Sequence, residues 1–567
     1  MPRLDYFAPG VYMEEVDRGS RPIEGVQTNV AGFIGFTEAV RSGAEVGKPM
    51  LVTSWSQYME YFGKEASDGF TDFGAYLPFA VNGWFLNGGG RCWIVSIGTE
   101  IPKPRPKDGE QQQHPDPKAN AIAVTTKNKK ESLRFSLKPG EVENGSVRVE
   151  IRPSQPLAVP EDSDDPTPIP AKFFSVVVSS DGEELERHDN LTMDSEVQSE
   201  VGQYVATKIQ DSQYLEIEVE QLTGLPLTRR PADGLYEVSP PPILPYRENL
   251  RKHVHGNRDK GTGIQGLYEI DEITMIACPD LMKVYEEGIL DDDQLHGIMG
   301  LMVDLCENNA PNPPNRMVVL DTPPPRIDTR KPGNEHKKPI KKPQHVHEWL
   351  SDFGRRSMFA ALYYPWVKVA NPKDEGRPIM VPPCGHMLGV WSRTDETRGV
   401  YKAPANETPR GIIGLDYDCN FREQELLNPQ GINCIRTFPN RGIKIWGART
   451  LAEPDKTEWR YINVRRLISY IEKSIELGTQ WVVFEPNDQD LWARVKRTVS
   501  NFLERLWRDG ALFGSTPDEA FYVKCDETIN TEETMILGRL YVEVGIRPVR
   551  PAEFVVFRIS QWSPGTE

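Results

Sequence analysis

The pattern of apolar and polar residues predicts an extended strand near each end of the chain. Near the start, the turn pair Pro9-Gly10 precedes a segment in which apolar residues alternate with others: Val11, Tyr12, Met13, Glu14, Glu15 and Val16. Near the end, Glu553 is followed by residues that are almost all β-branched or aromatic: Phe554, Val555, Val556, Phe557, Arg558 and Ile559. Neither strand has an obvious partner nearby in sequence. Because an unpaired strand edge readily pairs with another chain, the two segments point first to assembly.

Between these ends, the pattern predicts an α/β core. Buried strands are expected over residues 30–36 and 92–97, with a short helix between Ser54 and Gly63 and a second helix over residues 73–86. The same kind of pattern returns later, with strands expected at 273–277, 316–320 and 358–363 and a helix at 295–306. Strands separated by helices are typical of a largely parallel sheet.

A segment of different composition interrupts this core. After Gly98 the chain becomes rich in proline and glutamine, and short β-rich runs then follow between acidic and proline-rich loops as far as residue 225. We therefore expect a mostly β domain inserted into the α/β core. The predicted division is 1–20 (amino-terminal arm), 21–98 and 246–454 (core), 99–245 (insertion), 455–538 (helical and strand domain) and 539–567 (hairpin and arm).

The last 110 residues have the clearest helical periodicity. Apolar residues recur at helical spacing from Val464 to Ile475, a strand is expected at 481–484, and Asn487 can cap a second amphipathic helix that ends before Gly510. The other face of this second helix is basic and carries Arg494, Lys496, Arg497, Arg505 and Arg508. Two interpretations remain open for this face, a solvated surface and a contact with a particular acidic partner.

Composition restricts the class of protein. The 567 residues have a formal charge of −17 and a pI near 5.2, which disfavours nucleic-acid and anionic-membrane binding and favours protein partners. Seven scattered cysteines without a CxxC pair do not form a disulfide framework, so we expect synthesis in a reducing cytoplasm. The start lacks the apolar region of a signal peptide, and no run reaches the ~20 apolar residues of a membrane span. We expect no membrane insertion.

Several motifs resemble ligand sites, but each has a simpler interpretation. Gly43 to Lys48 is one residue short of a phosphate loop, and Pro49 stands where Ser or Thr should bind magnesium. Gly88-Gly89-Gly90 lies between a helix and the following strand, the wrong order for a dinucleotide site. The pairs His253 with His255 and His345 with His347 lack a third zinc ligand nearby. We therefore expect neither a cofactor nor a metal.

Two carboxylates and one basic stretch also have a simpler interpretation than a catalytic or binding site. Asp280 and Asp321 each follow an apolar strand, as catalytic carboxylates in α/β folds often do, but both stand beside turn formers, so a capping role is favoured. Residues 326–342 are basic, but no aromatic residues for base stacking lie among the charges. We expect no catalytic residue and no nucleic-acid partner.

The segments beyond about residue 380 resemble contractile tail sheath proteins. The similarity lies in Val381-Pro-Pro-Cys-Gly-His386, Arg393-Thr-Asp395, Arg398 to Glu407, Leu427-Asn-Pro-Gln-Gly-Ile-Asn433, Gly442 to Thr450, Tyr461-Ile-Asn-Val-Arg-Arg466 and Gly545 to Ile559. The opening Pro9 to Val16 and Arg21 to Val26 are similar to the amino-terminal arm of the same family. The resemblance that these strings carry spans nearly all of the chain except residues 99–260.

The resemblance implies a subunit that stacks in helically offset rings of six around an inner tube and contracts, with baseplate and terminal cap proteins as further partners. It implies that residues 11–16 and 554–559 are strands donated to neighbouring subunits, and that a hairpin through Leu540, Tyr541, Val542, Glu543 and Val544 receives one. It also implies that Arg494, Arg497, Arg505 and Arg508 face the tube.

The family core is described as subtilisin-like, so the alternative from another class is a serine hydrolase on such a core. The sequence offers no nucleophile string of that kind, and His386 is followed by Met387-Leu388.

Overall fold

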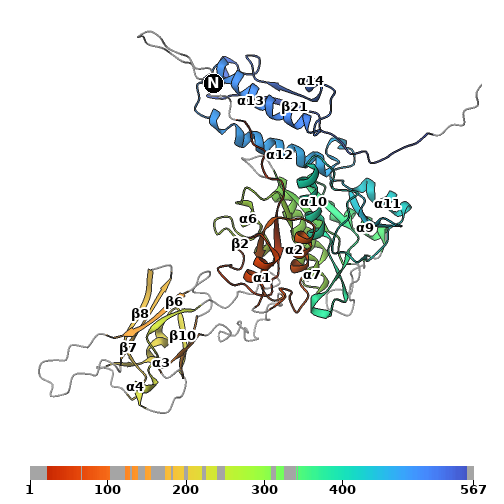
Figure 1. Cartoon of the computed structure of the whole chain (residues 1–567). Coiled ribbons are helices and arrows are strands. Elements are labelled where there is room, and N and C mark those ends of the chain that lie inside the picture. Colours follow the sequence, from red (N-terminus) through yellow and green to blue (C-terminus); the bar gives the residue numbers. More distant parts are fainter. Residues whose placement is uncertain are drawn as a thin grey trace, which may run out of the picture. The chain divides into compact units, whose positions relative to one another are not determined.

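The computed structural model describes most of the chain and divides it into two compact units (Figure 1). The residues described are 22–64, 67–101, 122–127, 130–137, 147–154, 173–180, 183–196, 202–219, 225–238, 250–307, 315–324, 340 and 342–558. One unit is Met1–Pro102 together with Asn249–Glu567, and the other is Lys103–Glu248. The predicted strand at residues 11–16 lies outside the described residues, as does Ile559.

A mixed sheet forms the centre of the larger unit. In the described part of the chain it has eight strands, in the order β19 (Gly442–Ile445), β18 (Ile432–Phe438), β14 (Ala360–Tyr364), β13 (Met317–Asp321), β12 (Met275–Ala277), β1 (Val30–Gly35), β3 (Arg91–Ser96) and β2 (Pro49–Val52). The strands from β18 to β3 pair in parallel, and the edge strands β19 and β2 pair antiparallel. The predicted parallel α/β core is confirmed, with antiparallel edges that the pattern did not indicate.

Helices and short elements surround this sheet. They are α1 (Trp55–Phe62), α2 (Leu77–Leu86), α5 (Leu250–His255), α6 (Gly263–Tyr268), α7 (Asp280–Glu286), α8 (Asp292–Glu307), α9 (Pro343–Phe353), α10 (Cys384–Arg398) and α11 (Phe421–Leu427). A small antiparallel sheet of β15 (Val367–Ala370), β16 (Pro378–Val381) and β17 (Gly414–Leu415) accompanies them. Helix α1 begins as predicted, because the Ser54 side chain accepts a hydrogen bond from the Gln57 backbone amide. Helix α2 begins four residues later than predicted, at Leu77.

The smaller unit is mostly β and has a hydrophobic core of its own. One sheet has the order β10 (Leu215–Val219), β5 (Glu131–Leu137), β4 (Ile122–Thr125), and the other β11 (Gly234–Val238), β6 (Val147–Pro153), β7 (Phe174–Ser180), β8 (Glu183–Thr192), β9 (Gln203–Tyr204). The short helices α3 (Val205–Lys208) and α4 (Pro226–Arg229) complete it. Strands β5, β6, β7 and β10 lie within the segment up to residue 225 in which short β-rich runs were predicted.

The last part of the chain folds around two long helices, α12 (Ile462–Gly478) and α13 (Gln489–Arg508), which lie side by side in Figure 1. Their facing residues, among them Leu467, Ile471, Val495 and Val499, belong to a hydrophobic cluster separate from that of the central sheet; we call it the C-terminal cluster. The remaining elements are α14 (Pro517–Ala520), β20 (Phe521–Lys524), α15 (Glu532–Ile536) and β21 (Glu543–Ile546). Both helices were predicted, and their separate core explains why the periodicity was so clear.

Two local predictions in this part were wrong. Instead of a strand at 481–484, residues Gln480–Val482 form a 3-10 turn, and Phe484 has a positive φ of 69°. The cap of α13 is Asp488 rather than Asn487, and its side chain accepts a hydrogen bond from the Leu491 amide at 2.8 Å. Within the residues that the structure describes, no helix combines the length and the apolar character that crossing a membrane would need.

Candidate inter-subunit surfaces at the two chain ends

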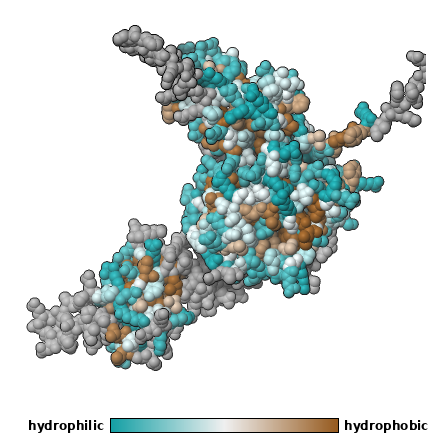
Figure 2. Space-filling view, in the orientation of Figure 1, coloured by the Kyte–Doolittle hydropathy of each residue, from teal (hydrophilic) through white to brown (hydrophobic). Residues whose placement is uncertain are grey.

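The end of the described chain is an exposed apolar segment. Phe554, Val555, Val556 and Phe557 are 74%, 69%, 78% and 83% exposed, and residues 554–558 pair with no other strand among the described residues. Figure 2 shows this segment as a brown stretch leaving the body on the right. We call residues 554–558 the C-terminal tail. The predicted strand is therefore not formed within the single chain, because a strand needs a partner for its ladder of hydrogen bonds.

A polar clamp holds the residue just before the tail. The Glu553 carboxylate accepts hydrogen bonds from Arg449 Nε at 2.9 Å and Arg449 Nη2 at 2.6 Å, from Asn428 Nδ2 at 2.7 Å and from the Tyr461 hydroxyl at 2.9 Å. We call this set the Glu553 clamp. Burial opposes ionisation of Glu553, but these donors outweigh it and hold the pKa below its ordinary value. The clamp therefore favours the charged carboxylate.

The donors of the clamp are themselves fixed. The Arg449 side chain is 9% exposed, and its Nη1 also donates to the Asn428 carbonyl at 3.1 Å. The backbone of Arg449 is bonded on both sides by the Asn433 side chain, at 2.7 Å and 2.8 Å. Tyr461 directly precedes α12 as its N-cap residue. The clamp thus connects the base of the tail to β18, where Asn433 lies, and to the start of α12.

At the other end, residues 22–28 lie against the C-terminal helices; we call them the N-terminal base. Ile23 is 1% exposed and belongs to the C-terminal cluster. Its carbonyl accepts a hydrogen bond from Arg505 of α13, and the Val26 amide donates to the Ser474 hydroxyl of α12 at 3.2 Å. The first described residues are therefore held mainly by apolar burial and by hydrogen bonds to the backbone.

A buried ion pair joins the N-terminal base to the central core. Asp395 of α10 and Arg466 of α12 have side chains only 5% and 6% exposed and lie 2.5 Å apart. Thr28 bonds to both, because its hydroxyl donates to Asp395 at 2.7 Å and its carbonyl accepts from Arg466 at 2.8 Å. Burial raises the pKa of Asp395, although Arg466 and Thr28 oppose the change. Helix α12 is thus connected to the core as well as to both chain ends.

The structure at the predicted receiver differs from the hairpin expected through residues 540–544. Only Glu543–Ile546 form a strand, β21, and its partner is the earlier strand β20, with Tyr522 opposite Gly545 and Val523 opposite Val544. Leu540, Tyr541 and Val542 precede the strand, and the Tyr541 amide donates to the Asn530 side chain at 2.7 Å. In the part of the chain that the structure describes, no third strand joins this sheet, although an isolated bridge between Leu512 and Pro548 lies just beyond β21. Each of the two strands therefore has one edge without a strand partner.

The basic residues of α13 have different surroundings. Arg494 lies 3.5 Å from Glu485 and over the Trp481 ring, Arg505 bonds to the Ile23 carbonyl, and Arg508 pairs with Glu504 at 2.5 Å. Arg497 is exposed. A groove of ~400 Å³ runs beside Arg505 and Arg508 and is also lined by Pro22, Ile23, Thr498, Asn501 and Glu504. Part of the predicted tube-facing surface therefore binds the chain's own N-terminal base.

The two aspartates at the carboxyl ends of core strands are capping residues. Asp280 accepts hydrogen bonds from the Phe36 amide at 2.6 Å and the Tyr76 amide at 2.5 Å, and Asp321 accepts one from the Cys384 amide at 3.1 Å. They thus cap the starts of α2 and α10. Burial raises the pKa of Asp280 to about 6 and that of Asp321 to about 7.

The chemistry expected of a hydrolase is not assembled around His386. This residue is buried in α10, and burial lowers its pKa to about 4. Within the described ranges its Nδ1 has no hydrogen-bond partner, and the ring packs against Gly83 and Gly411. A general base needs a nucleophile within hydrogen-bond reach, and no serine hydroxyl bonds to this ring among the described residues.

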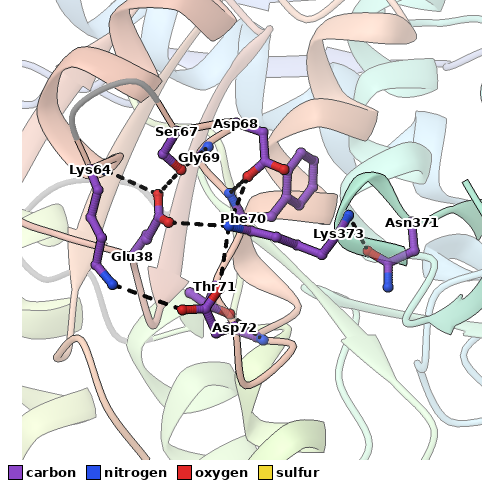
Figure 3. A network of polar contacts seen from close by, with 11 residues as sticks. Glu38, Lys64, Ser67, Asp68, Gly69, Phe70, Thr71, Asp72, Asn371 and Lys373 are labelled. Carbon is purple, nitrogen blue, oxygen red and sulfur yellow. Dashed lines mark hydrogen bonds and ion pairs between the residues drawn. The ribbon is translucent and has the colours of Figure 1, made fainter. Parts of the chain in front are cut away.

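A further polar network lies at the loop that follows α1 (Figure 3). Lys373 Nζ lies 3.4 Å from Glu38, 3.3 Å from Asp68 and 3.3 Å from Asp72. The Glu38 carboxylate also accepts a hydrogen bond from the Lys64 amide at 3.0 Å. One ammonium group thus contacts three carboxylates and joins the turn between β15 and β16 to this loop. Among the described residues, no group of three or more His, Cys, Asp or Glu side chains is arranged to hold a metal ion.

Sequence reasoning named most of the residues at the chain ends but missed their pairing. Glu553, Arg449, Asn428 and Tyr461 all lie in the strings that resemble sheath proteins, yet 104 residues separate Glu553 from Arg449. Ile23 likewise contacts Arg505 across 482 residues. In the sequence, the only signal for Glu553 is that an acidic residue directly precedes a run of four apolar residues.

Comparison with protein families supports a single assignment. The model described as the phage tail sheath protein central domain matches residues 353–451, and the model described as the phage tail sheath C-terminal domain matches residues 455–561. The residues of the Glu553 clamp all lie within these two ranges.

Curated relatives are similar over part of the chain. The tail sheath protein of Salmonella phage ViI is 27% identical over 227 residues, which are 39% of this chain and 34% of the phage protein. The tail sheath protein of Burkholderia phage BcepMu is 28% identical over 213 residues, which are 36% of this chain and 43% of that protein. The chain therefore matches less than half of the length of these relatives.

A solved structure shares the fold over nearly the whole chain. In the PVC sheath complex of an extracellular contractile injection system, solved in the contracted state, one chain aligns with a TM-score of 0.53 and 21% identity over 99% of both chains. At this identity the similarity establishes the fold alone.

Proposed function

Because the chain belongs to the family of contractile tail sheath proteins, we propose that it is a structural subunit that polymerises into a contractile sheath around an inner tube. In this proposal the subunits form rings of six that stack with a helical offset. Its partners are other copies of itself, the tube protein, and baseplate and terminal cap proteins. We propose that the core, which the resemblance implies to be subtilisin-like in fold, has no catalytic role, because a fold does not carry its chemistry with it.

The exposed tail is the observation that carries the proposal. Four consecutive apolar side chains, from Phe554 to Phe557, are more than two-thirds exposed, although the residue before them is held firmly. Exposed apolar segments of this kind need a partner, and extended ones can add a strand to an open sheet edge. The small sheet of β20 and β21 has such edges. We infer that the tail of one copy pairs with this sheet in a neighbouring copy.

Strand addition suits a sheath because many weak bonds are repeated. Each backbone hydrogen bond contributes about 0.5–1.5 kcal/mol net, and every subunit would contribute several. Residues 11–16 would act in the same way at the other end of the chain. The arms would keep subunits connected while the bodies rearrange between an extended and a contracted packing, a change that bistable interfaces can support.

The basic face of α13 is a candidate contact with the tube. Of the four arginines expected to face the tube, Arg494, Arg497 and Arg508 have no bond to the N-terminal base among the described residues. An acidic tube surface would complement them, and long-range attraction of this kind weakens with salt. Arg505 serves the subunit's own N-terminal base and is the weakest candidate of the four.

Proline substitution in the tail tests the proposed function. The double variant V555P and V556P removes two neighbouring N–H donors, one of which must face the receiving strand, and proline is incompatible with a central ladder. We expect a folded subunit with unchanged circular dichroism that forms no tubes in sedimentation and electron microscopy. The matched control, V555I with V556I, keeps both donors and should assemble normally. Tubes formed by the proline variant would contradict the proposal.

A further inference from the structure

The Glu553 clamp lies where the body of the protein ends. Among the described residues, Glu553 is the last whose side chain is substantially buried, at 19% exposed, and every residue of the C-terminal tail after it is exposed. Four donor groups on three different residues converge on one carboxylate. A carboxylate has about four acceptor sites, so these donors fill it, whereas a glutamate at the protein surface is normally solvated by water.

The clamp also fixes a direction. Arg449 approaches the carboxylate with both Nε and Nη2, a two-pronged geometry that defines orientation as well as position. Just before it, the Val549 carbonyl accepts a hydrogen bond from Asn463 in the first turn of α12 at 3.3 Å, and the Val549 amide donates to Ala511 at 3.1 Å. The chain is thus held at two points four residues apart, which determines the line along which the tail leaves.

We propose that Glu553 is a positioning residue, whose ionised carboxylate sets the exit direction of the C-terminal tail and so presents the tail to a neighbouring copy of this chain. This inference rests on the proposed function. A tail with a fixed starting point explores less space than a freely jointed one. Its local concentration at the receiver is then higher, and less entropy is lost when it pairs.

The proposal is specific to the charge of Glu553. Glutamine has nearly the same shape, but it would place an amide N–H₂ against the Arg449 guanidinium or the Asn428 amide, and both of these groups are donors. The E553Q variant should therefore weaken the clamp without leaving a cavity. Glu425, an exposed residue of α11, provides a matched control, since E425Q makes the same change of charge at a residue that is not part of the clamp.

The experiment measures tail mobility in the full-length monomer. All seven cysteines are buried, so a fluorophore attached to V556C labels the tail selectively. Anisotropy decay at nanomolar concentration then reports the motion of the tail before assembly. We expect the fast component of the decay to increase at least twofold in E553Q and to be unchanged in E425Q. Unlabelled E553Q should need at least a tenfold higher concentration than the parent protein to form tubes.

The outcomes separate this inference from the proposed function. If the parent protein forms no tubes, the proposed function fails, but the anisotropy of the monomer still tests the clamp. Unchanged mobility in E553Q overturns the inference, and so does increased mobility without an effect on assembly. If E553Q does not fold, Y461F takes its place, because it removes one donor of the four and should give a smaller change in the same direction.

Discussion

The two ends of the described chain are attached to the body by different physical means. At its first residues the N-terminal base is held by a buried apolar side chain, Ile23, and by hydrogen bonds to its backbone, and at its far end Thr28 bonds to the buried pair of Asp395 and Arg466. The C-terminal tail is held at Glu553 by a charged clamp. Both attachments reach helix α12, the first through Ser474 and the second through Tyr461 directly before the helix. With 17 residues, α12 spans about 25 Å at 1.5 Å per residue.

This difference implies different sensitivities. Apolar burial depends little on pH or salt near room temperature, whereas a clamp built on one carboxylate depends on the ionisation of that group. If the arms carry load between subunits, the N-terminal attachment should be the more constant of the two. Variants that affect one attachment and spare the other can test this comparison.

The largest effect is expected at Ile23. Replacing a fully buried Ile with Ala costs about 2–5 kcal/mol, because the side chain leaves a cavity in the C-terminal cluster. We expect I23A to lower the free energy of unfolding of this part of the chain by an amount in that range, measured by denaturant titration of tryptophan fluorescence. The control I536A changes a side chain that is 78% exposed and should alter stability by less than about 0.5 kcal/mol. Equal effects of the two variants would mean that Ile23 does not hold the N-terminal base.

The next effect is expected from removing the cation of the clamp. R449M leaves the Glu553 carboxylate buried without its main partner, and hydrogen bonds to charged groups contribute about 1.5–3 kcal/mol. We expect a loss of stability in this range together with a more mobile tail, measured by the anisotropy of a label at V556C. R550M, which alters an exposed arginine three residues from Glu553, is the control. If both variants leave the tail equally mobile, the clamp does not hold it.

Elements with a local sequence repeat were predictable, whereas contacts between distant parts of the chain were not. Helices α12 and α13 and the core strands were predictable because their apolar residues repeat locally, with periods set by backbone geometry. The expected strand at 481–484 failed because its apolar residues belong to a turn beside the C-terminal cluster. The Glu553 clamp was not predictable, since its specificity comes from donors 92 to 125 residues away, brought together only by the fold.

Acidification should release the tail and leave the N-terminal base attached. The clamp lowers the pKa of Glu553, so its stabilisation is present above the ordinary Glu pKa of about 4.3 and is lost as the pH falls through the lower value in the folded protein. Asp280 and Asp321 have raised pKa values, so their contribution is greatest in acid and is lost as the pH rises toward about 6 and 7. Protonation of Asp280 and Asp321 therefore does not explain a loss of clamp stability at low pH. Tail anisotropy should stay constant from pH 8 to about 5 and fall below about pH 4.

A constant anisotropy down to pH 3 in a folded protein would show that ionisation of Glu553 is not what holds the tail. A label at the other end supplies the comparison. Attached at E24C, between Ile23 and Val26, it should show no transition in the same pH range, because none of the contacts of Ile23 or Val26 includes a carboxylate in the described structure. Position 27 is less suitable, because the neighbouring Thr28 donates to the Asp395 carboxylate.

The smallest effect is expected at Arg505, where the two interpretations of the basic face of α13 meet. Its guanidinium donates to the Ile23 carbonyl, and one such bond contributes about 0.5–1.5 kcal/mol. R505Q should therefore destabilise the N-terminal base slightly, by unfolding measurements, whereas R508Q should have no measurable effect on stability because the Arg508 pair is exposed. In tube-templated assembly the order should reverse: R508Q should weaken assembly in a salt-dependent way, and R505Q should weaken it only as far as stability falls. If R505Q instead impairs assembly more than R508Q at equal stability, Arg505 contacts the tube, and the attachment of the N-terminal base and the tube contact are then a single site.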